Sequence, residues 1–190
     1  MTRHIGYNSQ RNNVKVNGLG GYSQCFSTVN WMRMSYYSPL VIVEDDKGLA
    51  QYLQYIETEG KKLENVPHPS LYFDVQAAGV TKWLNDRGVS GHDVFQEKFP
   101  IDALPEKLKK CPITIGTHNL GGLPNGHIIL LVDWDEYSGS FVVNDPFGDA
   151  ILKYDENNSG ESLLYPFNFL LPYINYNGGT AHVLYWEDGE

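Results

Sequence analysis

Residues 126–146 read GHIILLVDWDEYSGSFVVNDP, in which a polar segment separates two runs of apolar and β-branched residues. The first run covers 127–134 and the second covers 140–144. The segment between them, 135–139, combines acidic residues with Tyr, Ser and Gly, a composition typical of a turn. The pattern predicts two antiparallel strands that are joined as a β-hairpin.

The two ends of this predicted hairpin carry polar residues that can act together. Glu136 is the midpoint between positions 127 and 145, so a hairpin centred there returns the chain to His127 at Asn144 or Asp145. A side chain at that point would orient the imidazole and stabilise its charged form. Adjacent strand residues point to opposite faces, so only one of the two can face the histidine, and the sequence leaves the choice open.

The rest of the chain divides into a helical part and a later strand part. Helical periodicity predicts helices over 25–37, 44–60 and 74–87, with a shorter one over 101–110. Further strands are expected over 112–117 and 181–186, whereas 151–174, rich in Tyr, Pro and Asn, predicts no single element. This order is typical of an α+β fold, in which a helical half packs on an antiparallel sheet half with a ligand cleft between them. At 190 residues, the chain is predicted to form one domain, 1–190.

Composition argues against several classes of partner. With 23 acidic and 14 basic residues, the net charge of −9 leaves no broad basic surface, so we expect no nucleic acid. Apolar runs fall short of the ~20 residues that cross a bilayer, so no membrane insertion is expected. The amino terminus lacks an apolar signal region, which predicts a protein that stays in the cytoplasm until it is released. The spacing of the His and Cys residues fits no metal site, and no cofactor is expected.

Cys25 stands immediately before the first helical stretch. A thiol at a helix amino terminus faces unpaired backbone N–H groups and the positive end of the helix dipole, which favour the nucleophilic thiolate. The alternative is a buried cysteine that packs as a small apolar residue. Cys111 lies at a predicted strand edge without such surroundings, and we interpret it as structural.

Two blocks of sequence resemble the bacteriocin-processing-like branch of the papain-like cysteine peptidases. The first block is YNSQRNN at 7–13 with CFSTVNWM at 25–32. The second is GHIILLVD at 126–133 with VNDPFGD at 143–149, and more loosely the stretch 160–165. The ordered set of a Gln before the Cys, then Gly-His, then Asn-Asp-Pro carries the resemblance, which spans most of the chain.

The resemblance implies a role for four residues. Cys25 matches the nucleophile, His127 the general base and Asp145 the carboxylate that orients the base. Gln10 matches the amide that binds the oxyanion together with the N–H of Cys25; Gln24, directly before the cysteine, does not match that position. The resemblance also implies a papain-like form of the α+β fold, with these residues in the cleft.

The resemblance to this peptidase family also limits the class of substrate that we expect. Exporter-type members carry Cys-Gly where this chain has Cys25-Phe26, and no transporter domain follows, which argues against cleavage of a Gly-Gly leader. Free-standing members resemble lysins of phages or bacteria, so a peptidoglycan stem peptide is the expected substrate. Such a lysin reaches the cell wall through a lysis pore or in association with a virion. Two alternatives stay open: a peptidase that processes one protein partner, and a residual papain-like binding or structural module of a phage particle.

Overall fold

The computed structural model describes residues 5–38, 41–63, 66–89, 92–175 and 178–188. Within these ranges, the strands form one antiparallel sheet in the order β1-β6-β2-β3-β4-β5. The bounds of the strands are β1 His92–Pro100, β2 Ile113–Thr117, β3 His127–Asp135, β4 Ser140–Asn144, β5 Leu163–Pro166 and β6 Thr180–Asp188. The predicted α+β class is confirmed.

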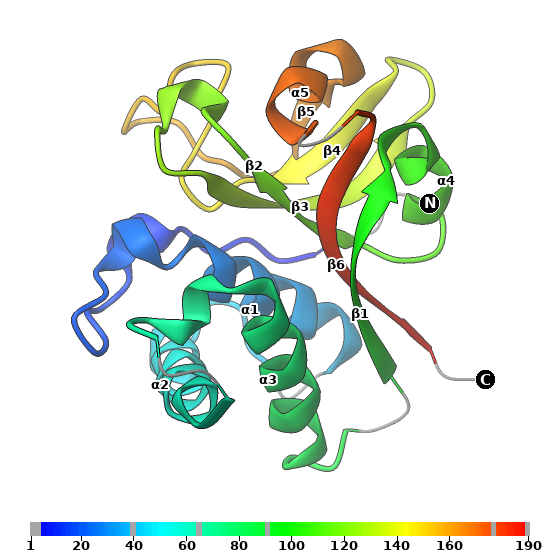
Figure 1. Ribbon diagram of the computed structural model, residues 1–190. Helices are drawn as coiled ribbons and strands as arrows, with labels where there is room; N and C mark the ends of the chain where they lie inside the picture. The colour runs from blue at the N-terminus through cyan, green and yellow to red at the C-terminus, as the bar shows by residue number, and fades with distance from the viewer. Residues whose placement is uncertain (1–4, 39–40, 64–65, 90–91, 176–177, 189–190) are drawn as a thin grey trace.

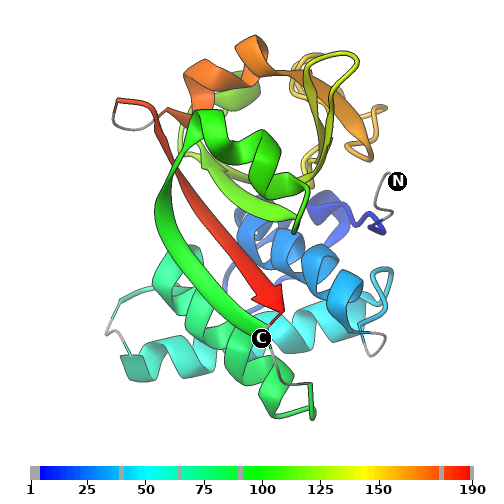
Figure 2. The ribbon, with the colours of Figure 1, turned by 90° about the vertical axis from the view of Figure 1, so that its right-hand side faces the viewer.

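Helices cover the two faces of the sheet. Figure 1 shows α1, α2 and α3 grouped below the central strands, with α5 above them. The bounds of the helices are α1 Cys25–Tyr37, α2 Asp46–Leu63, α3 Phe73–Asn85, α4 Leu104–Leu108 and α5 Phe167–Ile174. Seen from the side, β1 and β6 form a long ribbon that extends from the sheet half toward the helical half, where β1 contacts α3 (Figure 2). No helix in the described ranges has the length and apolarity to span a membrane.

Helix α1 is the central element of the helical half. All its residues from Phe26 to Met34 are buried, including the polar ones. Val29 and Met32 pack on the face of the sheet that presents Leu130 and Val132 of β3. This contact fixes the direction of α1 relative to β3, and the amino terminus of the helix carries Cys25.

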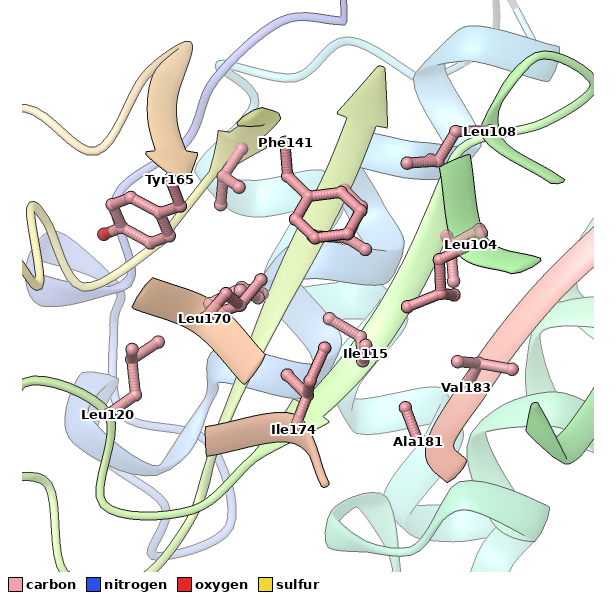
Figure 3. Packing of buried hydrophobic residues seen from close by; sticks show 14 of the residues in the cluster. Leu104, Leu108, Ile115, Leu120, Phe141, Tyr165, Leu170, Ile174, Ala181 and Val183 are labelled. Atoms are coloured by element: carbon pink, nitrogen blue, oxygen red, sulfur yellow. The ribbon is translucent and has the colours of Figure 1, made fainter. Parts of the chain in front are cut away.

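The opposite face of the sheet packs on α4 and α5. Figure 3 shows this cluster, in which Ile115 and Phe141 of the sheet meet Leu104, Leu170 and side chains from the later loops. Burial of apolar area at roughly 25 cal/mol per Å² makes such a cluster the main source of stability. The sheet is therefore covered on both faces and forms a rigid support for the ends of β3 and β4.

Most predicted elements coincide with observed ones. The first predicted helix has the bounds of α1, and the second and third differ from α2 and α3 by one to three residues. The predicted helix over 101–110 is instead a 3₁₀ turn at Ile101–Ala103 followed by the short α4. Three elements were absent from the prediction, β1, β5 and α5, and the last two fall in the stretch left unassigned.

Candidate active site

Cys25 is the first residue of α1, and its thiol is half-buried. A 3₁₀ turn at Gly21–Ser23 leads the chain to this point. Gly21 is required there, because a β-carbon at this position would lie 2.1 Å from the carbonyl oxygen of Gln10. The first N–H groups of a helix have no acceptor within the helix, so they form a local environment that favours an anion beside the Cys25 thiol.

His127 is the first residue of β3, and its ring is buried. Its backbone pairs with Thr117 of β2, whose hydroxyl also donates to the His127 carbonyl oxygen at 3.0 Å. Gly126, directly before it, adopts a φ of +79°, a conformation that favours glycine. The position of the histidine is thus set by the sheet.

The hairpin brings Asp145 to His127. Nε2 of His127 lies 2.6 Å from Oδ1 of Asp145, whose side chain is fully buried. The N–H of Phe147 donates to the same oxygen at 2.9 Å. Asn144 faces other groups: its amide donates to the carbonyl oxygen of Ile5 at 3.1 Å and accepts from the N–H of Ser162 at 2.9 Å. Of the two candidates at the end of β4, Asp145 is therefore the one that faces the histidine.

Burial and two neighbouring residues, Asp145 and Cys25, act on the pKa of His127. Burial alone would lower the pKa of the imidazole. The adjacent Asp145 carboxylate, its hydrogen bond to the ring, and the hydrogen bond and charge of Cys25 outweigh burial and raise the pKa to about 10. The raised pKa favours the protonated imidazole beside the Asp145 carboxylate.

Gln10 contacts both the segment that precedes Cys25 and the turn that follows Asp145. It begins a 3₁₀ turn at Gln10–Asn12, its backbone N–H donates to the carbonyl oxygen of Pro146 at 2.9 Å, and its Nε2 donates to that of Gly21 at 2.9 Å. The structure therefore brings Gln10 to the segment that precedes Cys25, with one amide N–H engaged by Gly21. The amide of Gln24 instead donates to two carbonyl oxygens of the 14–19 segment, at 2.9 and 3.0 Å.

A cleft of about 470 Å³ opens beside Cys25 and His127. One wall is apolar and comprises Phe26, Leu71 and Phe73, and the other comprises the ends of β2 and β3. The ring of His182 stacks on Phe73 of this wall, with the ring centres 3.8 Å apart. A larger, more open groove of about 740 Å³ lies between residues 14–17 and helices α2 and α3, but none of the predicted site residues lines it.

Sequence reasoning missed three tyrosines that surround Asp145. The hydroxyls of Tyr154 and Tyr165 lie 3.1 and 3.4 Å from Oδ2 of Asp145, and the hydroxyl of Tyr7 donates to its backbone carbonyl oxygen at 3.1 Å. The unusual density of Tyr after Asp145 was the available signal, but ordinary packing explains such a density equally well.

Two further observations bear on the site: whether its residues could hold a metal ion, and whether the chain is similar to known proteins. Within the described residues, no group of three or more His, Cys, Asp or Glu side chains is arranged to hold a metal ion. No protein-family model matches the chain, and a comparison with curated proteins found no significant match. The geometry around Cys25 is therefore the main indication of what this chain does.

Proposed function

We propose that this protein is a cysteine peptidase that cleaves its substrate through Cys25. The observation that carries the proposal is the placement of His127 between Cys25 and Asp145, with a hydrogen bond of 2.6 Å to the carboxylate. A thiol at a helix amino terminus, a base and a group that orients the base are the three parts that nucleophilic catalysis by cysteine needs. Their position beside an open cleft gives a substrate access to the thiol.

The proposed reaction proceeds through a thioester. The Cys25 thiolate attacks the carbonyl carbon of a peptide bond, and the carbonyl oxygen takes up the negative charge. The backbone N–H of Cys25 and the amide of Gln10 are expected to donate to this oxyanion. His127 gives its proton to the leaving amine as the C–N bond breaks. It then takes a proton from water, whose oxygen attacks the thioester, and collapse of this intermediate releases the acid and restores the thiolate–imidazolium pair.

We further propose the stem peptide of peptidoglycan as the substrate class. The resemblance to free-standing lysins supports this choice, and the cleft of about 470 Å³ beside Cys25 is where we expect the peptide to bind. The net charge of −9 opposes adsorption to anionic wall polymers. Activity on cell walls should therefore hold or increase as salt screens this repulsion, whereas a basic lysin that adsorbs to the wall would show the opposite trend.

The decisive assay follows the turbidity of purified sacculi and the chemical groups released. The wild-type protein should lower the turbidity and release new amino groups without new reducing sugar ends. Cys25→Ala should abolish both effects, and Cys111→Ala should retain them. The lysin proposal fails if sacculi release neither new amino groups nor reducing sugar ends while a defined protein partner is cleaved or simply bound. Cleavage would favour the processing peptidase, and binding alone would favour the structural module.

A further inference from the structure

Tyr154 contacts two members of the proposed triad at once. Its hydroxyl donates to Oδ2 of Asp145 at 3.1 Å, and its ring meets the ring of His127 edge to face, with centres 5.9 Å apart and an interplanar angle of 84°. The side chain is buried and comes from the long connection between β4 and β5. A residue in this connection thus touches both the base and the carboxylate that orients it.

The hydroxyl of Tyr154 occupies a defined place among the donors to Asp145. Oδ1 of the carboxylate receives His127 and the N–H of Phe147. Oδ2 receives Tyr154, and at the longer distance of 3.4 Å it receives Tyr165, whose oxygen also accepts the N–H of Ala150. A buried carboxylate is costly without hydrogen bonds, and of the two tyrosines Tyr154 provides the shorter contact to Oδ2.

The backbone at Tyr154 is strained, and the surroundings hold it in place. Lys153 and Tyr154 have φ angles of +55° and +60°, in the left-handed region that non-glycine residues seldom adopt. Gly121 provides space for the ring, because a β-carbon there would lie 2.3 Å from Cε2 of Tyr154. Nη2 of Arg11 donates to the Tyr154 carbonyl oxygen at 2.7 Å. Strain that neighbours hold in this way is typical of functional sites.

The hydroxyl of Tyr154 also stays a donor over the working pH range. Burial raises the pKa of this phenol, and the negative charge of Asp145 raises it further. The phenol therefore keeps its proton at neutral pH and donates it to Oδ2 of Asp145.

We propose that Tyr154 is a positioning residue that holds the Asp145 carboxylate oriented toward His127. The inference rests on the proposed function, since it assigns Tyr154 a part in forming the Cys25–His127 pair. It predicts that loss of the hydroxyl raises the pH at which the pair is lost on acidification, because a carboxylate that can turn away from the ring stabilises the imidazolium, and with it the thiolate, less.

The test measures the rate of Cys25 alkylation by iodoacetamide as a function of pH. In this reaction the thiolate displaces iodide and forms a C–S bond, so the rate reports the thiolate without any peptide substrate. Tyr154→Phe keeps the ring and removes the hydroxyl, and Tyr173→Phe in α5 is the matched control. The acid limb of the profile is the pH range in which the alkylation rate falls on acidification. We expect Tyr154→Phe to move this limb to a higher pH by about one unit. The control should match the wild type.

Two further measurements separate positioning from a loss of stability. On a substrate that the wild type cleaves, Tyr154→Phe should lower kcat about tenfold and leave KM unchanged. In an Asp145→Asn background the same substitution should have no further effect on alkylation, because the hydroxyl acts through the carboxylate. If Tyr154→Phe does not fold, Arg11→Ala, which removes the hydrogen bond to the Tyr154 carbonyl oxygen, should shift the acid limb in the same direction.

The outcomes distinguish this inference from the proposed function. A wild-type protein in which Cys25 reacts no faster than a free thiol, and in which the rate falls on acidification at the same pH as for a simple cysteine, would contradict the proposed cysteine peptidase itself. A reactive wild type whose profile is unchanged by Tyr154→Phe would contradict only the role of Tyr154. An additive effect in the Asp145→Asn background would likewise reject positioning through Asp145.

Discussion

Nε2 of His127 lies 2.6 Å from Oδ1 of Asp145, although the two residues stand 18 positions apart at the open end of one hairpin. The pairing of β3 with β4 shifts between Leu131 and Asp133, where β3 contains an irregularity. Beyond it, Leu130 pairs with Asn144, whereas a hairpin centred on Glu136 would pair it with Val142, so the predicted register is wrong by two residues. Asp145 therefore follows the last paired residue of β4. The carboxylate thus reaches the histidine from the turn that ends the strand, and the N–H of Phe147 in this turn helps to hold it.

We expect Cys25 to react with alkylating reagents at least tenfold faster than Cys111 in the folded protein at neutral pH. Cys25 is half-buried at a helix amino terminus with His127 beside it, whereas Cys111 is buried. Peptide mass mapping after limited alkylation gives the order of labelling directly. Earlier labelling of Cys111 would reject Cys25 as the nucleophile.

Substitution of Asp145 should mainly lower the catalytic rate, whereas substitution of Asn144 should mainly lower the stability of the fold. We expect Asp145→Ala to lower kcat by on the order of 10³ or more, because the imidazolium loses its partner. Asn144→Ala should retain most of kcat but lower the free energy of unfolding by roughly 1–3 kcal/mol, because it loses a buried hydrogen bond to Ile5 and a partly buried one from Ser162. Kinetics and urea denaturation of the two variants check both statements, and a reversed order of their activities would refute the assignment of Asp145.

Gln10→Ala should lower kcat by on the order of 10² to 10³ with little change in KM, the loss expected when one oxyanion donor is removed. The matched control is Gln24→Ala, since both amides are buried and both donate to backbone carbonyl oxygens. We expect the control to lose stability but to retain kcat. If the two variants exchange these effects, Gln24 provides the donor instead.

The free energy of unfolding should depend on pH through His127. The pKa of its imidazole is about 10 in the folded protein, above the usual value of 6.5. Because the folded state binds this proton more tightly, the stabilisation is fully present below pH 6.5 and is lost as the pH rises toward 10. The urea midpoint of the wild type should therefore decrease more between pH 6 and pH 10 than that of His127→Gln. Equal decreases would show that the histidine has no raised pKa.

The elements with clear periodicity could be predicted from sequence, whereas those stabilised by pairing or packing could not. The hairpin of β3 and β4 consists of apolar, β-branched runs around a polar turn, so its pattern is local. In contrast, β1 carries Gln96, Glu97 and Lys98 in succession at an exposed edge of the sheet, where no apolar alternation is needed. Helix α5 contains Pro172, which argues against a helix in sequence, yet its apolar side chains bury against the sheet.

For the candidate site, sequence provided the residue types but not all the contacts. The choice between Asn144 and Asp145 depends on where the pairing of β4 ends, which the hairpin pattern does not determine. The role of Tyr154 depends on the space left by Gly121, some 30 positions earlier in the chain. Such a contact forms between distant segments, and no periodicity in either segment predicts it.

Strand β6 links the two halves of the molecule through its own side chains. It lies between β1 and β2, and its residues Ala181 and Val183 belong to the apolar cluster shared with α5, while Trp186 belongs to the cluster of α1, α2 and α3. Removal of β6 from the sheet would therefore open both clusters together. We therefore expect the helical half and the sheet half to unfold as one unit, so that the candidate site between them forms and disappears with the whole fold in a single cooperative transition.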